Sequence, residues 1–271
     1  MLRGGLQAKE FFFSLFTEES CRVCKRPLSV GSWLLNMQAS AGLEAKPALL
    51  HEWNALPCYS NVLCQQCWDE LLEAVPIIGF CGAKEEYSFA VVSGASYKGD
   101  VRKLIHRLKY EGDRMVVKDL ATIMLFGWRM AAIFLDRQNA ILVPVPLHWR
   151  KTIKRGFNQS DLIAREAGKT LKIPVCKNAL RRSRSTIEQQ KLERPERFAN
   201  VASAFRGNPR KLKDKVVVLI DDVCTSGATL SACAREATRC GATKVVALTV
   251  ARTVLRKELN ADATIISTEL S

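Results

Sequence analysis

No apolar run in this sequence is long enough to cross a membrane as a helix. Residues 120–135 form a run of 16 residues that includes Arg129, whereas a spanning helix needs about 20 apolar residues. A shorter apolar stretch at residues 11–16 is closely flanked by Lys9 and Glu10, which is not typical of a secretory signal. The chain also has no internal repeat and no low-complexity tract. These absences predict a cytoplasmic protein with no transmembrane segment.

Without a secretory signal, the 10 cysteines of the chain are not expected to form disulfides. In a reducing compartment such thiols are metal ligands or core residues. The cysteines that precede residue 82 are Cys21, Cys24, Cys58, Cys64, Cys67 and Cys81. Breaker residues between 76 and 88 follow this cluster. We therefore predict a cysteine-rich module over residues 1–85 and a larger domain over residues 86–271.

Acidic residues are scarce in the larger part of the chain. Residues 1–85 carry 7 basic and 9 acidic residues, whereas residues 86–271 carry the remaining 34 and 18, a net charge of +16. Such asymmetry favours a polyanionic partner, which could be nucleic acid, a phosphorylated ligand or an anionic membrane surface. The alternative is a solvated basic surface with no partner.

Apolar runs alternate with helical patterns after residue 88. The runs at 89–95, 141–145, 216–220 and 245–250 predict strands. The intervening periodicity predicts helices over 101–110, 158–171 and 227–240, with Asp100 and Asn158 as N-caps. This alternation predicts an α/β fold, a mostly parallel sheet with helices on both faces.

Two adjacent carboxylates followed by a small hydroxyl-rich loop stand between a predicted strand and a predicted helix. Ligands bind at the carboxyl ends of such strands, and a helix start suits a phosphate. Vicinal sugar hydroxyls or Mg²⁺ would satisfy the paired carboxylates, while an ordinary capped helix is the alternative. The candidate substrate-binding residues are Asp221, Asp222, Thr225, Ser226, Gly227, Ala228 and Thr229.

These residues resemble the ribose-phosphate signature of type I phosphoribosyltransferases. The resemblance implies that Asp221 and Asp222 hold the ribose hydroxyls of phosphoribosyl pyrophosphate, which binds with Mg²⁺. It also implies that the loop 225–229 holds the 5-phosphate. In such a site, cations and backbone donors must stand where negative charge develops on the leaving pyrophosphate.

Further blocks extend the resemblance to the ComF (competence protein F) family, phosphoribosyltransferase-like proteins with an N-terminal zinc module. These blocks are residues 108–113, 143–146 and 155–159, the aspartate loop, and the spaced series Arg182, Thr186, Gln189, Arg197 and Asn200. The resemblance implies that Lys109 lies near the pyrophosphate and that residues 181–200 form a flexible lid. Lys109, Arg155 and Arg182 are the candidate catalytic residues.

The ComF resemblance implies binding of phosphoribosyl pyrophosphate and single-stranded DNA, and a part in DNA uptake during natural transformation. It leaves room for protein partners of the competence system at the inner face of the membrane. Whether the protein catalyses phosphoribosyl transfer is left open. The alternatives are a nucleobase-salvage phosphoribosyltransferase, and a non-catalytic DNA-binding adaptor whose ribose-phosphate pocket is a sensor.

Two C-x-x-C pairs, Cys21/Cys24 and Cys64/Cys67, predict a tetrahedral thiolate site for Zn²⁺. The 39 residues between the pairs exceed the usual zinc-ribbon gap, and Cys58 or Cys81 could replace a ligand. The ComF resemblance implies that this zinc is structural.

One tryptophan, Trp149, has an unusual setting for a core residue. It stands among Arg150, Lys151 and Lys154. An aromatic ring beside cations can stack on a base of single-stranded nucleic acid, and packing against the lid is the alternative.

Overall fold

The structure of the protein is a computed structural model, and it describes residues 20–26, 63–64, 66–67, 71, 76–81, 88–128, 131, 139–182 and 204–253. The chain divides into two compact units, Met1–Glu73 and Ala74–Ser271. Strand β1 (Ile77–Cys81) pairs with a strand of the second unit. The sheet of that unit therefore begins before residue 86, where we expected the larger domain to start.

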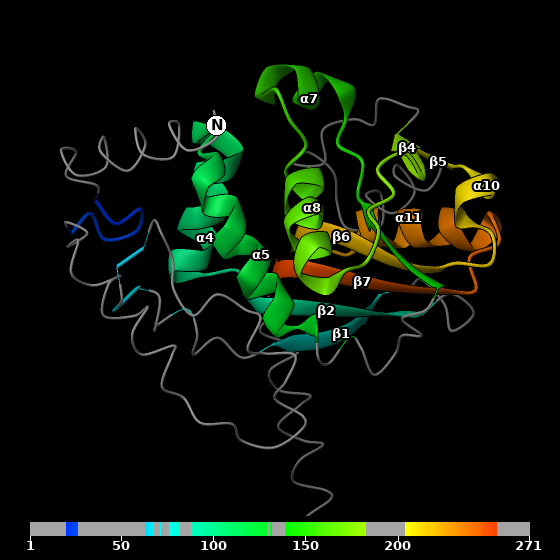
Figure 1. Cartoon of the computed structure of the whole chain (residues 1–271), viewed down its shortest axis with the longest axis horizontal. Helices are drawn as coiled ribbons and strands as arrows, with labels where there is room; N and C mark the ends of the chain where they lie inside the picture. Colours follow the sequence, from blue (N-terminus) through cyan, green and yellow to red (C-terminus); the bar gives the residue numbers. More distant parts are fainter. Residues whose placement is uncertain are drawn as a thin grey trace, which may run out of the picture. The chain divides into compact units, whose positions relative to one another are not determined.

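A five-stranded sheet with the order β1-β2-β7-β6-β3 forms the centre of the second unit (Figure 1). Its other strands are β2 (Phe89–Ser96), β3 (Ala140–Pro144), β6 (Val216–Cys224) and β7 (Lys244–Arg252). Among the described strands of this sheet, β1 is antiparallel to β2, and the pairs β2–β7, β7–β6 and β6–β3 are parallel. The predicted mostly parallel sheet is confirmed.

The strands form where the sequence is continuously apolar and β-branched. The first five residues of β6 are all buried, as expected for a central strand that is covered on both faces. β6 also continues past the apolar run to Cys224, so Asp221 and Asp222 belong to the strand itself. A buried hydrogen bond of 2.7 Å joins the hydroxyls of Ser93 and Thr249 across β2 and β7.

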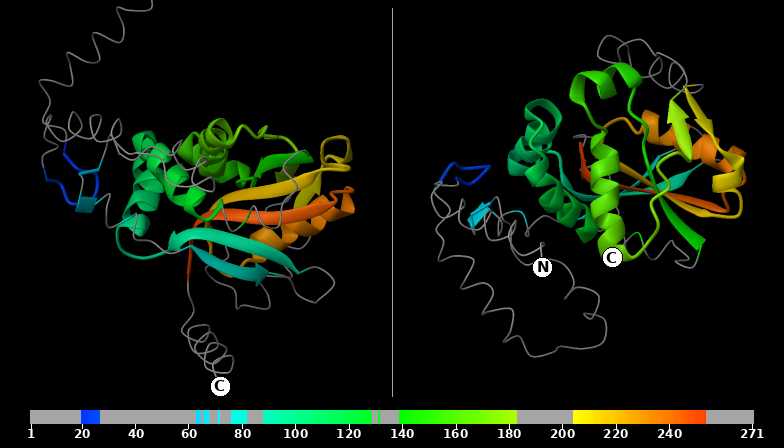
Figure 2. Two further views of the ribbon diagram at one scale, coloured as in Figure 1. Left: turned by 60° about the horizontal axis from the view of Figure 1, so that its bottom comes forward. Right: turned by 45° about the horizontal axis from the view of Figure 1, so that its top comes forward.

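Helices cover both faces of the sheet, as predicted. α5 (Val117–Phe126) and α8 (Gln159–Leu171) lie on one face, and α11 (Ala228–Arg239) lies on the other (Figure 2). α5 contacts β2 and β7, while α8 contacts β3 and β6. The approach of α5 is so close that a Cβ at Gly94 would clash with the carbonyl oxygen of Ile123. Glycine is therefore required at this position.

Shorter elements complete the second unit. They are α4 (Gly99–His106), the π-helix η2 (Arg107–Glu111), the 3-10 helix η3 (Arg114–Val116), α7 (Trp149–Arg155), α10 (Pro209–Leu212), and a separate hairpin of β4 (Leu180–Arg182) and β5 (Phe205–Gly207). The prediction that Asp100 caps α4 is wrong. Lys98 is the N-cap residue, and Asp100 lies in the first turn, where it accepts a 2.8 Å hydrogen bond from Lys103.

Candidate functional site

Asp221 and Asp222 lie near the carboxyl end of β6, and both carboxylates are held by defined partners. The Ser160 hydroxyl donates a 2.8 Å hydrogen bond to Oδ1 of Asp221. The backbone N–H of Asp222 donates to the same oxygen at 2.9 Å. Ser160 lies in the first turn of α8, so the start of that helix is tied to the aspartate pair. Sequence reasoning missed this role of Ser160, although the residue directly follows the 155–159 block.

Asn158 explains why α8 starts in register with the aspartates. Its side chain accepts a 3.2 Å hydrogen bond from the backbone N–H of Ser160, so it is the N-cap residue, as predicted. Its amide also donates a 3.0 Å hydrogen bond to the carbonyl of Val145, directly after β3. A single side chain thus joins the end of one strand to the start of the helix that holds Asp221.

Lys109 is the candidate catalytic residue that the structure brings to the aspartates. Its ammonium group forms a salt bridge with Asp222, and the two side chains are 19% and 5% exposed. A regular helix through residue 110 would have placed Lys109 on the solvated face that carries Arg102 and His106. The chain instead switches to the wider π-helix at Arg107, which changes the direction of the residues that follow.

Burial and neighbouring charges shift the pKa values of Asp221 and Lys109. Burial, and then the neighbouring charge of Asp222, raise the pKa of Asp221 to about 7, against the hydrogen bond from Ser160. Burial alone would lower the pKa of Lys109, but the carboxylates of Asp222 and Asp221 outweigh it and raise this pKa. Asp221 therefore titrates near neutrality beside a lysine that stays charged.

The loop after β6 has the backbone geometry of an anion site. Gly227 adopts a left-handed conformation with a φ of 73° and is the N-cap residue of α11 without a capping side chain. Side-chain capping is limited to a long contact of 3.5 Å between the Ser226 hydroxyl and the N–H of Ala228. The first turn of the 12-residue helix α11 thus presents N–H groups and a positive dipole end beside the loop.

A thiol lies directly behind the loop. A Cβ at Gly227 would clash with the Sγ of Cys81, which comes from the edge strand β1. A hydrogen bond with Cys81, and then burial, raise the pKa of the Cys224 thiol at the end of β6. Gly227 is thus needed both for its φ and because Cys81 fills the space behind it. No sequence signal connects these distant positions.

The other two candidate catalytic residues have different neighbours. Arg155 ends α7, donates a 2.8 Å hydrogen bond to Gln159, and stands 5.8 Å from the ring centre of Tyr110. Arg182 ends β4, and its guanidinium lies 5.5 Å from the ring centre of Phe205. Both assignments stay predictions.

Much of the predicted lid lies outside the described residues. This concerns Thr186, Gln189, Arg197 and Asn200, and the stretch 181–200 from residue 183 onward. Within the described segments, no helix combines the length and the apolar character that crossing a membrane requires.

The sulfur atoms of Cys21, Cys24, Cys64 and Cys67 form a group in the first unit. All four lie within 4.8 Å of one another, and the Cys24 and Cys64 sulfurs are 3.6 Å apart. A tetrahedral Zn²⁺ with sulfurs at about 2.3 Å requires edges of about 3.8 Å, so the group fits this ion. The backbone N–H of Lys25 donates to the Cys21 carbonyl at 3.0 Å and closes the turn between the first two cysteines.

Burial raises the pKa values of the Cys64 and Cys67 thiols in this group, whereas the pKa of Cys24 is lowered. A backbone hydrogen bond from Arg26 is the main cause that lowers the pKa of Cys24 to about 6, and the Arg26 side chain adds to it. Of the alternative ligands, Cys81 lies in β1 of the second unit, and Cys58 is outside the described residues. The cysteine cluster could therefore hold a metal such as zinc, with the four ligands predicted.

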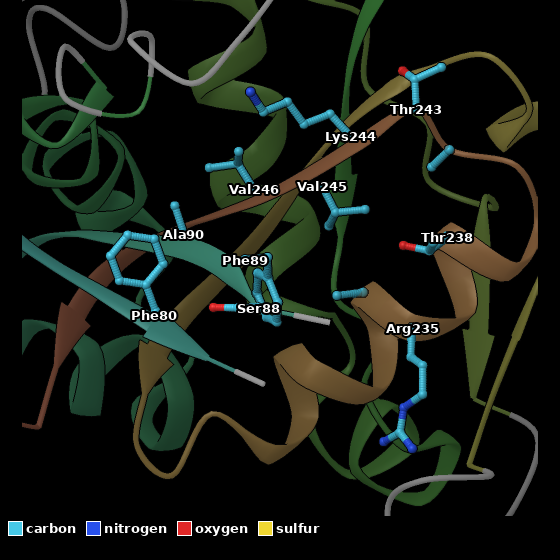
Figure 3. Close-up of a pocket in the computed structure, with 12 residues that line it drawn as sticks. Phe80, Ser88, Phe89, Ala90, Arg235, Thr238, Thr243, Lys244, Val245 and Val246 are labelled. Carbon is cyan, nitrogen blue, oxygen red and sulfur yellow. The ribbon is translucent and has the colours of Figure 1, made fainter. Parts of the chain in front are cut away.

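A groove of about 470 Å³ opens at the opposite end of the sheet (Figure 3). It lies between the starts of β2 and β7 and the second half of α11. Phe80 borders it with a 64% exposed side chain, and Arg235 and Lys244 add positive charge. Because parallel α/β sheets bind ligands at the carboxyl ends of their strands, we place the candidate site at Asp221 and Asp222 rather than here.

Comparison with known proteins finds similarity over most of this chain. Residues 154–269 match the phosphoribosyl transferase domain. The chain is 27% identical over 239 residues to the DNA utilization protein YhgH of Escherichia coli, covering 86% of this chain and 97% of that protein. It is 28% identical over 190 residues to competence protein F of Haemophilus influenzae, covering 63% and 82%. It is 26% identical over 140 residues to competence protein ComFC of Bacillus subtilis, covering 52% and 54%. Together with the fold, these similarities support a ComF-family, phosphoribosyltransferase-like protein.

Proposed function

We propose that the protein binds phosphoribosyl pyrophosphate with Mg²⁺ at the carboxyl end of β6. The observation that carries this proposal is the cluster of Lys109, Asp222, Asp221 and Ser160 beside the start of α11. Carboxylates that accept hydrogen bonds suit vicinal hydroxyls, and a helix start suits a phosphate.

Each part of the cluster has a role in this proposal. Asp221 and Asp222 hold the ribose hydroxyls, and the backbone and hydroxyls of residues 225–229 hold the 5-phosphate. Lys109 neutralises Asp222 before the ligand arrives and faces the pyrophosphate once it is bound. Mg²⁺ supplies charge neutralisation for the pyrophosphate oxygens. Arg155 and Arg182 are the further cations of the site.

The relatives' names direct the biological part of the proposal. They refer to DNA utilization and to competence, and residues 86–271 carry a net charge of +16. We therefore include binding of single-stranded DNA and a part in DNA uptake during natural transformation. A cytoplasmic location and partners at the inner membrane face remain predictions. The cysteine cluster holds a structural Zn²⁺ in this proposal.

Calorimetric titration with phosphoribosyl pyrophosphate and Mg²⁺ tests the pocket. Exchanging both aspartates (Asp221→Asn with Asp222→Asn) keeps their size and should weaken binding about ten-fold or more, because charge-assisted hydrogen bonds become neutral ones. Asp214→Asn is the matched control, since Asp214 is exposed and has a left-handed φ of 59° that asparagine also tolerates. Equal affinity of the double variant and the wild type would contradict the assignment.

Pyrophosphate release separates the three functional alternatives. A salvage enzyme releases pyrophosphate when a free nucleobase is added. An enzyme that acts on DNA releases it when single-stranded DNA is added. A sensor binds the ligand in the calorimeter and releases none under either condition.

A further inference from the structure

The helix α7 stands out because it buries none of its seven residues. The His148 side chain accepts a hydrogen bond from the Arg150 N–H at the start of the helix, and Gly156 ends it with a left-handed φ of 77°. Trp149 is 57% exposed and Ile153 is 73% exposed. A well-defined helix that offers large apolar side chains to solvent serves something other than the core.

Cations and aromatic rings interleave on this helix and on the neighbouring η2. The guanidinium of Arg150 lies 5.3 Å from the ring centre of Trp149, and that of Arg155 lies 5.8 Å from the ring centre of Tyr110. Tyr110 is itself 68% exposed. We call this set the α7 surface; its members are Tyr110, Trp149, Arg150, Lys151, Lys154 and Arg155.

The charge of the α7 surface has one sign. α7 has four basic residues and no acidic residue among its seven. Within the described part of the chain, no carboxylate forms an ion pair with Arg150, Lys151 or Lys154. Positive side chains that are not paired with carboxylates attract a polyanion and gain by releasing its counterions.

We infer that the α7 surface is where the protein binds single-stranded nucleic acid, an inference that rests on the DNA-binding part of the proposed function. Bases of a single strand can stack on exposed rings such as Trp149 and Tyr110, while cations between the rings neutralise the phosphates. A duplex hides the faces of its bases, so it would gain only the phosphate contacts.

The α7 surface adjoins the candidate ribose-phosphate site. Tyr110 follows Lys109 directly on η2, and Lys109 pairs with Asp222. Arg155 donates to Gln159, the residue before Ser160, which donates to Asp221. The bound strand would therefore lie beside the candidate ribose-phosphate site rather than at the groove near Phe80.

Fluorescence anisotropy with a labelled oligothymidylate of about 20 nucleotides, longer than one such surface can occupy, tests this inference. Trp149→Ala should weaken binding about five- to one-hundred-fold through lost stacking, and Trp149→Phe should retain most of the affinity. Exchanging Lys151 and Lys154 for alanine should reduce the slope of log affinity against log salt by about 1.4, since each phosphate contact contributes about 0.7.

Matched controls come from the groove at the other end of the sheet. Phe80→Ala removes an aromatic ring that is 64% exposed, and Lys244→Ala removes an exposed cation. Both should bind the oligonucleotide as the wild type does. All variants should keep the thermal midpoint of the wild type, because the exchanged side chains are exposed.

The outcomes distinguish this inference from the function on which it rests. If the wild type does not bind the oligonucleotide at low salt, the DNA-binding function itself is rejected. If the wild type binds and the α7 variants bind equally well, only the α7 surface is rejected.

A further measurement uses vesicles of anionic phospholipid in place of the oligonucleotide. Vesicle binding that Trp149→Ala abolishes, with unchanged DNA binding, would overturn the inference in favour of a membrane contact.

Discussion

The ionisation of Asp221 has a measurable effect on stability. The pKa of Asp221 is raised to about 7, chiefly by burial and then by the charge of Asp222, against about 3.9 in an unfolded chain. Between these pH values the folded state binds more protons than the unfolded state, so stability falls as pH rises.

The first prediction is therefore that Asp221→Asn removes this pH dependence. The wild type should lose stability relative to the variant between pH 4 and 7, by at most about 4 kcal/mol, because one pKa unit corresponds to about 1.4 kcal/mol. Asparagine can still accept the hydrogen bonds of Ser160 and of the Asp222 N–H. Urea unfolding of both proteins at several pH values measures the difference. If the stabilities of the wild type and the variant changed in parallel with pH, Asp221 would have an ordinary pKa.

Gly227 gives a second prediction at the residue scale. Gly227→Ala should destabilise the protein by about 2–4 kcal/mol, because alanine disfavours a left-handed φ and its Cβ meets the sulfur of Cys81. Adding Cys81→Ala should recover part of the lost stability. The remaining destabilisation of about 1 kcal/mol comes from the left-handed backbone conformation at residue 227. A double-mutant cycle of unfolding free energies checks this. Strictly additive effects would mean that the sulfur does not limit the loop.

The π-helix η2 determines the setting of Lys109 at the scale of elements. Lys109→Met should destabilise the protein by about 3 kcal/mol, because it leaves the buried Asp222 carboxylate without its cation. Combining Lys109→Met with Asp222→Asn should recover most of the lost stability. Lys103→Met is the control: its salt bridge with Asp100 is on the surface, where such pairs contribute about 0.5 kcal/mol or less. Equal effects of both methionine variants in denaturant unfolding would contradict a buried pair.

The predictability of the elements follows from the range of the interactions that form them. The strand β6 and the helix α8 could be predicted because apolar runs and a capping asparagine act locally. The direction of the Lys109 side chain could not be predicted, because the apolar spacing of this segment is that of a regular α-helix and does not indicate a π-turn. The close approach of Cys81 to Gly227 could not be predicted either, since it depends on how β1 packs behind the loop. The acidic pair was recognisable from its residues alone, but its link to Ser160 required the fold.

At the scale of the whole molecule, the two units should depend differently on metal. We expect one zinc ion per chain, and Cys64→Ser should lose it, whereas Cys176→Ser, outside the cluster, should retain it. Removing the ion with a strong chelator should unfold the first unit, because a structural zinc site contributes folding energy. The second unit should keep its thermal transition, because its sheet has its own core.

Elemental analysis gives the zinc content, and hydrogen exchange resolved along the chain shows which unit opens. Zinc-free protein from a fresh preparation, or loss of protection in the sheet on chelation, would contradict this division of stability.

Two consecutive residues of η2 belong to different sites. Lys109 pairs with Asp222 in the candidate ribose-phosphate site, while Tyr110 is exposed on the α7 surface. A change in one turn of this π-helix would move both. If one ligand shifts the equilibrium between two arrangements of η2, thermodynamic linkage requires a reciprocal effect. The factor by which phosphoribosyl pyrophosphate changes the affinity for nucleic acid must then equal the factor by which nucleic acid changes the affinity for phosphoribosyl pyrophosphate.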